Sequence, residues 1–559
     1  MRAGALTLLL ALAAAPAGAQ TGRFDLVIRG ARILDGTGNP AFPADVGIRD
    51  GRIARVGDLS RAGAGRTVDA TGLILAPGFI DLHSHADDGA SARGGFRDPD
   101  PKRRAAPNLV SQGVTTVVVN QDGRSPWPIA EQRRLLEQHG IGPNAILLVG
   151  HGTVRGRALG RDPRRPATGE EIAAMRRMVH QAMEEGAWGL SAGLEYVPGR
   201  WSTTDEVVAL AEEIVPYRGV YVSHERSEGA DPMWYWPSQD PPGPPTLLDA
   251  VRETIEIGER SGATVVASHI KAKGSQYWGS SGAAIRLIER ARARGVDVWA
   301  DQYPYATSGS DGGTVLIPRW VWREPAAPGT GGSDLGSLRT VLADSGKRAA
   351  LERDIRHEIE RRGGADKVVV FEHPDPSTIG RSLAEVGRAW RLDPVATAVA
   401  LQLRGDSTRP GGGRLRGFSM DEVDIESYAA RPWVATASDA GIALPEDGPD
   451  VHARYYGTFP RKIRRYALER GVLELPDAIR SMTSLPAQIL GLRDRGLVRE
   501  GLVADLVLFD PERITDRATF EAPHQHADGI TLVLVGGEPV VDGGELTWRL
   551  PGAVLLRDR

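Results

Sequence analysis

The sequence predicts a (β/α)8 barrel, or TIM barrel, joined to a small β-sandwich domain that both ends of the chain build. Short alternating or β-branched runs with Gly and Asp-Gly turns fill residues 24–78 and return at 504–546. Such runs are typical of hairpins. Between them, eight apolar runs alternate with helical patterns such as residues 169–186. Strand–helix alternation at this count favours the barrel.

The order of these runs also predicts the domain boundaries. We expect the β-sandwich domain over residues 24–78 and 495–559, and the barrel over 79–494. A long segment at about 311–430, before the last apolar run, is expected to be an insertion on the top face of the barrel. The eight expected strands are 78–85, 115–121, 145–152, 188–196, 219–228, 264–272, 296–305 and 433–441.

Residues 1–19 have the composition of a secretory signal peptide. One Arg precedes an apolar run from Ala3 to Ala15, and Ala17-Gly18-Ala19 supplies a cleavage site. The run is too short to span a membrane comfortably, and no later stretch is long and apolar enough. We therefore expect an exported protein, periplasmic or secreted, with no stable membrane insertion.

The rest of the composition narrows the kinds of partner and ligand. Lys and Arg total 68 against 72 Asp and Glu, with no basic stripe, so we expect no nucleic-acid partner. The chain has no cysteine, which excludes disulfides and thiolate ligands. A metal ion must therefore be held by His, Asp, Glu or a modified residue.

Polar residues end several of the expected barrel strands. His83 and His85, in GFIDLHSH, are two residues apart and so face the same way on a strand. His224, His269 and Asp439 also follow apolar runs, and the carboxyl ends of barrel strands converge. One histidine after a strand is usually a hydrogen-bonded rim residue, but five such residues together predict a zinc site of N and O ligands.

A series of motifs runs in order through the mature chain: GFIDLHSH, GVTTVVV, GHGTVR, GLSAGLEYVPG, YVSHERSE, SHIKAKG, DQYPY, SDAG, ARYYGTFPR, MTSLPAQILGL and ADLVLFDP. In these motifs the chain resembles the amidohydrolase superfamily, and within it the D-aminoacylase (N-acyl-D-amino-acid deacylase) group. The resemblance implies a metal-dependent barrel with a flanking β-sandwich.

The resemblance also implies a metal-bridging ligand, and here the sequence departs from the family. The family often has Gly-Asn-Cys-Gly after the second strand, with a zinc-binding Cys. This chain has Asn-Gln-Asp-Gly, so Asp122 stands in place of that Cys. Many amidohydrolases bridge two metals with a carboxylate after the fourth strand, where this chain has Glu195. We expect one or two zinc ions per chain, with Glu195 as bridging ligand and Asp122 as the alternative.

The family further implies a clamp for the α-carboxylate of the substrate, formed here by Lys271, Tyr196 and Arg454. Both cations suit a carboxylate, and Arg can hold it with two hydrogen bonds. His151, in GHGTVR, and Tyr305, in DQYPY, are further pocket candidates.

Zinc would make hydroxide available for attack on an amide. We expect Asp439 to act as general base and then as general acid.

The leading hypothesis is a zinc hydrolase that releases a D-amino acid from its N-acyl derivative, a small-molecule substrate. A dipeptidase for substrates with a C-terminal D-residue would use the same chemistry. A binding or scaffold protein that has lost catalysis is a third possibility, which the strand-end histidines argue against. Hydrolysis of a cyclic amide, as by a hydantoinase, is less expected, because the carboxylate clamp implies a substrate with a free carboxylate.

The signal peptide generates the first testable prediction. Active protein recovered from the periplasm or the medium should begin near Gln20 or Thr21 when its N-terminus is sequenced, because cleavage follows the small-residue site. Active cytoplasmic protein that keeps Met1 would contradict this expectation.

Overall fold

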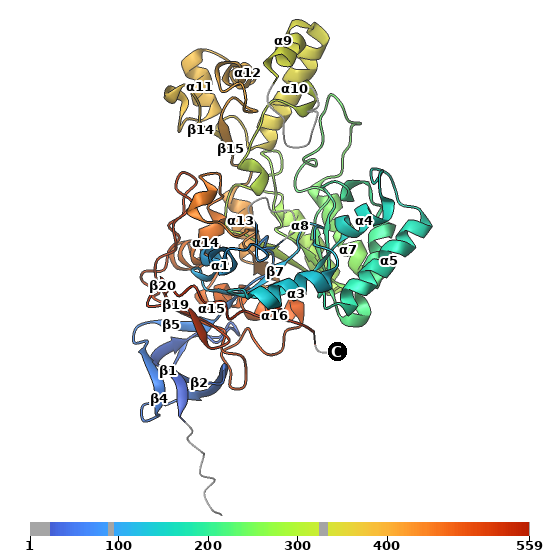
Figure 1. Cartoon of the computed structure of the whole chain (residues 1–559). Coiled ribbons are helices and arrows are strands. Elements are labelled where there is room, and N and C mark those ends of the chain that lie inside the picture. The colour runs from blue at the N-terminus through green and yellow to red at the C-terminus, as the bar shows by residue number, and fades with distance from the viewer. Residues whose placement is uncertain (1–22, 88–93, 323–333, 558–559) are drawn as a thin grey trace, which may run out of the picture.

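The computed structural model describes residues 23–87, 94–322 and 334–557 of the chain (Figure 1). The expected signal peptide lies outside the described residues and stays a prediction. No helix within the described ranges combines the length and hydrophobicity needed to cross a membrane. Figure 1 shows a β domain at one end, a barrel in the middle and an inserted unit at the other end.

The middle of the chain forms the barrel, which confirms the predicted fold class. Its strands pair in parallel, in the orders β6-β7-β8 and β9-β10-β11-β12-β13-β16. Ser84 and Ala440 form a parallel bridge, and the backbone N–H of Asp439 donates to His83 O at 2.9 Å, so the last strand meets the first. The strands are β6 (Phe79–Asp81), β7 (Val114–Val119), β8 (Asn144–Leu147), β9 (Val149–Gly150), β10 (Gly189–Gly193), β11 (Val220–His224), β12 (Thr264–Ala267), β13 (Val298–Gln302) and β16 (Val434–Thr436).

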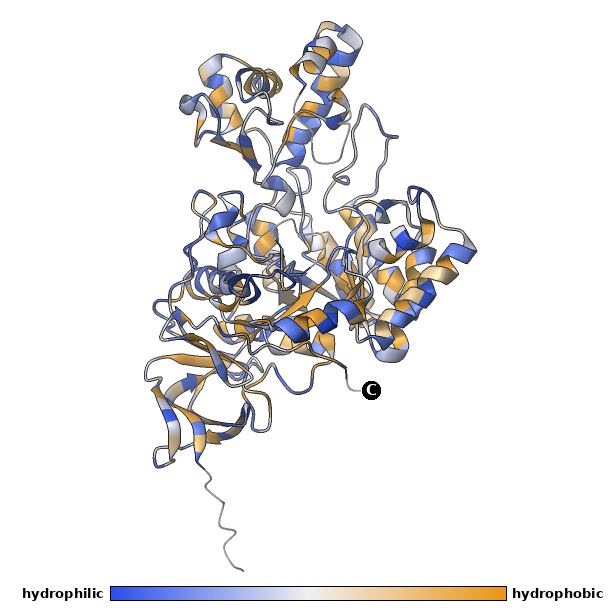
Figure 2. Ribbon diagram, in the orientation of Figure 1, coloured by the Kyte–Doolittle hydropathy of each residue, from blue (hydrophilic) through white to orange (hydrophobic). Residues whose placement is uncertain are grey.

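These strands are covered on both faces, which explains their continuous apolar runs. Every residue of β7 and β10 is buried. Surrounding helices turn apolar stripes toward the strands and polar faces outward (Figure 2). They are α1 (Pro101–Arg104), α2 (Pro107–Val110), α3 (Ile129–His139), α4 (His151–Leu159), α5 (Gly169–Glu184), α6 (Thr204–Glu212), α7 (Leu247–Ser261), α8 (Ser281–Ala293), α13 (Glu422–Ala429), α14 (Arg454–Arg461), α15 (Leu475–Ser481) and α16 (Ser484–Leu490).

Both ends of the chain contribute to the β domain, which is one nine-stranded sheet. β5 joins the two halves, because it pairs with β1 on one side and with β17 on the other. The chain then returns to the barrel, where Gly552 and Val554 form bridges with Ile141 and Ala145. The strands are β1 (Phe24–Ile33), β2 (Phe42–Arg49), β3 (Arg52–Gly57), β4 (Ala64–Asp69), β5 (Ile74–Pro77), β17 (Leu506–Phe509), β18 (Ile530–Val535), β19 (Glu538–Asp542) and β20 (Glu545–Leu546).

Between β13 and β16 the chain leaves the barrel and folds into a unit with its own apolar core, which includes Leu338, Leu351 and Leu401. Thr307, after β13, donates to Gly417 O at 2.6 Å, so β15 is held against the top face of the barrel. The elements of this unit are α9 (Leu335–Ala343), α10 (Ser345–Arg361), β14 (Val368–Glu372), α11 (Leu383–Trp390), α12 (Pro394–Arg404) and β15 (Arg414–Gly417).

Candidate metal centre

Six side chains converge at the carboxyl ends of the barrel strands. They come from the ends of five strands, β6, β7, β11, β12 and β16, and are buried or nearly so. Close-packed polar side chains at this face are the usual composition of a barrel active site. The six are His83, His85, Asp122, His224, His269 and Asp439.

The carboxylate of Asp122 lies at the centre of the four imidazoles. Its Oδ1 is 3.6 Å from Nε2 of His83, 3.5 Å from Nδ1 of His224 and 3.5 Å from Nε2 of His269. Its Oδ2 is 3.6 Å from Nε2 of His85. Two tetrahedral zinc ligands at ordinary bond lengths lie about 3.3–3.6 Å apart. The spacing around Asp122 therefore fits zinc ligation.

The hydrogen bonding of Asp122 points the same way. Its Oδ1 is buried and has no hydrogen-bond donor among the described residues. A buried carboxylate oxygen without a donor is costly. A cation among the surrounding nitrogens would satisfy it, so the donor set fits a metal ion.

A second ligand group adjoins the first. His83 and His85 approach with their Nε2 atoms 3.4 Å apart, and His85 Nε2 lies 3.1 Å from Asp439 Oδ1. His83 belongs to both groups, since its Nε2 also lies 3.7 Å from Asp439 Oδ1. Two groups that share an imidazole suit one metal ion or a pair of ions.

Residues outside the cluster fix the orientation of His83. Ser268 Oγ donates its hydrogen to Asp301 Oδ2 at 2.8 Å. The same Ser268 Oγ must therefore accept a hydrogen bond from His83 Nδ1–H at 2.6 Å. The lone pair of His83 is then on Nε2, which faces Asp122. Such outer hydrogen bonds orient metal-binding imidazoles in proteins.

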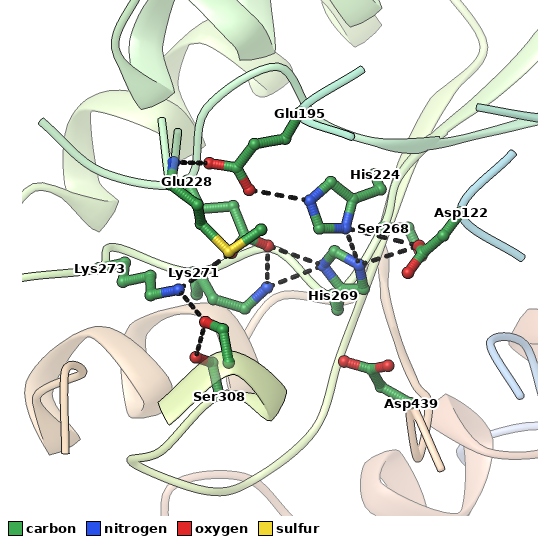
Figure 3. Close-up of polar contacts among 12 residues, drawn as sticks. Asp122, Glu195, His224, Glu228, Ser268, His269, Lys271, Lys273, Ser308 and Asp439 are labelled. Atoms are coloured by element: carbon green, nitrogen blue, oxygen red, sulfur yellow. Dashed lines mark hydrogen bonds and ion pairs between the residues drawn. The ribbon is translucent and has the colours of Figure 1, made fainter. Parts of the chain in front are cut away.

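Glu195, which we expected to bridge the metals, lies behind His224 instead. Figure 3 shows Glu195 and Asp122 on opposite sides of that imidazole. Oε2 of Glu195 is 3.0 Å from His224 Nε2, and Oε1 accepts from the backbone N–H of Met233 at 2.6 Å. Both oxygens of Glu195 are therefore occupied, and the geometry favours Asp122 as the central carboxylate. The expectation for Glu195 came from the family resemblance. In this chain β10 ends at Gly193, and the backbone turns before Glu195.

Burial and neighbouring charges hold His83 and Asp122 in the charge states that a metal requires, but they favour the protonated form of His224. Burial lowers the pKa of His83 well below its ordinary value, so the imidazole stays neutral. Burial alone would raise the pKa of Asp122, but the facing imidazoles outweigh it and hold the pKa well below its usual range. For His224, burial is outweighed by Asp122 and Glu228, and the pKa rises to about 10. A metal ion must therefore displace a proton from His224.

The backbone is strained where the cluster residues leave their strands. Asp122, His269 and Asp439 have φ angles of 57°, 37° and 49°. Such left-handed conformations are uncommon for residues other than glycine and tend to occur at functional sites. The strain turns each side chain toward the common centre.

Two of the three expected carboxylate-clamp residues carry charges, and both border the cluster. Arg454 Nη1 lies 3.0 Å from Asp439 Oδ2, and Lys271 Nζ lies 2.8 Å from His269 Nδ1. Tyr303 lies between these cations, with its ring centroid 4.7 Å from Arg454 Cζ and 5.6 Å from Lys271 Nζ.

The third residue, Tyr196, is half-buried, and its ring centroid lies 4.3 Å from that of His224. All three expected clamp residues therefore adjoin the cluster.

Two other expected pocket residues face elsewhere. His151 Nε2 lies 2.9 Å from Glu206 Oε1 on α6. The hydroxyl of Tyr305 donates to Ala453 O at 3.4 Å, and its ring lies 4.8 Å from Arg461 Cζ. Tyr303, two residues before Tyr305, borders the cluster instead. These corrections arise because β9 and β13 end before the residues concerned.

Three residues at the site were not singled out from the sequence. Glu228 pairs with Lys271 and lies 3.2 Å from His269 Nδ1, while Ser268 and Asp301 orient His83 as described. Ser268 and Asp301 directly follow apolar runs, and that position was a signal in the sequence. Glu228 lies four residues past the end of β11, where no such signal exists.

Comparison with known proteins agrees with this geometry. The family model described as "Amidohydrolase family" matches residues 66–212 and 383–541. These ranges include four of the six cluster residues: His83, His85, Asp122 and Asp439.

The chain belongs to the amidohydrolase family.

Similar proteins cover nearly the whole of this amidohydrolase. A D-aminoacylase of Alcaligenes xylosoxydans xylosoxydans is 34% identical over 557 residues, which is 96% of this chain and 98% of that protein. An N-acyl-D-glutamate deacylase of the same organism is 35% identical, covering 96% and 97%. A solved N-acyl-D-glutamate deacylase from Bordetella bronchiseptica, complexed with zinc and a phosphonate inhibitor, superposes with a TM-score of 0.71 at 32% identity, covering 96% and 100%.

The two carboxylates beside His224 generate the second prediction. Asp122→Ala should weaken zinc binding by more than the roughly 10–100-fold typical of losing an outer hydrogen-bond partner, because it removes a ligand. Glu195→Gln, the matched control, should stay within that range. The measurement is zinc titration in a metal buffer, with circular dichroism to verify folding. A greater loss in the Glu195 variant would make Glu195 the ligand.

Proposed function

We propose that this amidohydrolase is a zinc-dependent amide hydrolase that removes the acyl group from N-acyl-D-amino acids, giving a carboxylate and a free D-amino acid. One observation carries the proposal: the buried cluster of imidazoles and carboxylates directly adjoins the cations Arg454 and Lys271. The cluster suits amide hydrolysis, and the cations suit an α-carboxylate. The relatives named as deacylases of N-acyl-D-amino acids support the substrate class.

Zinc would be held by the residues of the cluster. When bound, zinc supplies Lewis acidity to a water molecule and to the amide carbonyl. We propose Asp122 as the central carboxylate of the ligand set, because it lies near all four imidazoles. The complete proposed ligand set is His83, His85, Asp122, His224, His269 and Asp439.

Asp439 is placed to move the proton that hydrolysis requires. Burial alone would raise its pKa, but Arg454 and the neighbouring imidazoles lower it well below the usual range. The carboxylate is therefore ionised and can accept a proton from the attacking water. As the carbonyl carbon–nitrogen bond breaks, Asp439 gives this proton to the leaving amine nitrogen. The same residue acts first as base and then as acid.

Arg454 and Lys271 would hold the α-carboxylate on the amine side of the scissile bond. Arg454 is only 5% exposed, and its Nη1 lies 3.0 Å from Asp439 Oδ2, beside the proposed proton-transfer group. A carboxylate bound to these cations places the leaving amine near Asp439. Fixed placement of this kind is a major source of rate enhancement.

A substrate screen tests the proposed function. Zinc-loaded enzyme should hydrolyse N-acetyl-D-amino acids and leave their L enantiomers, because the relatives that are 34% and 35% identical are named for D-amino-acid substrates. Release of free amino acid is the measurement, and L,D-dipeptides are the comparison set. If only the dipeptides are hydrolysed, the enzyme is a dipeptidase and not a deacylase. Absence of turnover on every substrate would contradict enzymatic function.

Asp439→Asn tests the proton-transfer role. The variant keeps a similar shape and an oxygen atom, so zinc content should largely survive. The kcat should fall by at least about 10²–10⁴-fold, as is typical when a general acid–base group is lost. The measurement is kcat together with zinc per chain. A near-normal kcat would mean that another residue is the base, and combined loss of zinc would make Asp439 chiefly a ligand.

A further inference from the structure

A cavity of about 400 Å³ opens beside Arg454. Its walls come from three segments far apart in sequence: residues 309–315 after β13, residues 409–416 around the start of β15, and residues 450–455 around the start of α14. Arg454 lines this cavity and also contacts Asp439. A substrate held by Arg454 would therefore have this space next to its α-carboxylate.

The lining of the cavity is rich in arginine. Its lining includes four arginines and a single acidic residue, Asp450. Arg409 lies 2.7 Å from Glu372 and 3.3 Å from Asp450. Arg414 lies 3.0 and 3.2 Å from the same two carboxylates. These charges balance one another, and Arg454 has Asp439 as its partner.

Arg416 is the exception. Its side chain is 1% exposed, and its Nε and Nη1 have no hydrogen-bond partner among the described residues. The described part of the chain offers it no ion pair within 4 Å. Its guanidinium carbon lies 4.7 Å from the ring centroid of Phe520 and 5.5 Å from that of Phe371. Aromatic rings stabilise such a cation only partly.

The neighbouring carboxylates do not resolve this imbalance. Asp311 is engaged with Arg362 at 3.0 Å and accepts from Ser419 Oγ at 2.6 Å. Burial, with a smaller contribution from Arg414, lowers the pKa of Arg416 to about 10, so the guanidinium remains charged at neutral pH. A buried charge without a partner is strongly destabilising. An anion that enters the cavity would supply the missing partner.

We propose that Arg416 binds the side-chain carboxylate of the substrate and makes the enzyme selective for N-acyl derivatives of acidic D-amino acids. The inference rests on the proposed function, which places the α-carboxylate at Arg454. The amino-acid side chain branches from the same carbon as that carboxylate, so it extends into the adjoining cavity. A planar guanidinium with free N–H groups matches a carboxylate, which can accept two parallel hydrogen bonds.

Selectivity within matched pairs of substrates tests this role. N-acetyl-D-glutamate and N-acetyl-D-glutamine have the same shape and differ in side-chain charge, as do the aspartate and asparagine derivatives. The wild-type enzyme should have at least about tenfold higher kcat/KM for the acidic member of one pair, as expected for a charged hydrogen bond. In Arg416→Met the acid-to-amide ratio should fall by about 10–150-fold, mainly through KM. Arg416→Lys should recover part of the ratio.

Arg409→Met is the matched control. Arg409 lines the same cavity but is paired with Glu372 and Asp450, so the ratio should change by less than about fivefold. A structural role for Arg416, through its contacts with Phe520 and Phe371, would lower thermal stability without changing the ratio. If Arg416→Met fails to fold, the acid-to-amide ratios of the wild-type enzyme and of Arg416→Lys test the proposal instead.

The outcomes separate this inference from the proposed function. If the wild-type enzyme has the same kcat/KM for the amide member as for the acidic member of both pairs, the role of Arg416 is overturned and the deacylase proposal stands. An unchanged ratio in a folded Arg416→Met variant would do the same. Failure to deacylate any N-acetyl-D-amino acid would overturn the proposed function, and this inference with it.

Discussion

The attraction between one buried carboxylate and four imidazoles organises this protein. Asp122 reaches His83, His85, His224 and His269 at 3.5–3.6 Å. Neither a lone carboxylate nor a group of imidazoles is stable when buried without compensation. The imidazoles partly compensate the negative charge of the buried carboxylate, and a metal cation would compensate the rest. The position of this carboxylate therefore constrains the strands that deliver the imidazoles.

The fold provides that position through parallel strands whose carboxyl ends meet at one face. Closure of the barrel by the contact between Asp439 and His83 brings the two ends of the barrel sequence together. Outer hydrogen bonds then set the imidazoles: Ser268 holds His83, and Glu195 holds His224. The inserted unit between β13 and β16 adds an arginine-rich wall to the same face. The proposed chemistry at the centre and the proposed selectivity at the rim thus use different parts of the chain.

The sequence predicted the barrel and most of the cluster because local patterns carried the information. His83, His85, His224, His269 and Asp439 each follow an apolar run, and parallel strands bring such positions together. Those arguments need only strand order and direction, and both were readable from the alternation of strand and helix patterns.

Other features depended on where strands stop and on contacts between distant segments. Glu195 was expected as a ligand from the family resemblance, but it lies two residues past the end of β10, and its carboxylate contacts His224 and Met233. Tyr305, which was expected in the pocket, contacts Ala453 and Arg461 instead. Tyr303, just past the end of β13, lies beside Lys271 and Arg454. Arg416 faces a cavity whose other walls lie about 100 residues before it and about 40 residues after it, and the sequence has no local pattern that reveals such a meeting.

The most direct test of the account is a crystal structure of the zinc-loaded protein with anomalous diffraction recorded at the zinc edge. The account predicts an anomalous peak about 2.0–2.2 Å from a carboxylate oxygen of Asp122 and from imidazole nitrogens of the cluster, with Glu195 still bonded to His224. A zinc ion ligated by Glu195, with Asp122 turned away from it, would contradict the central position given to Asp122.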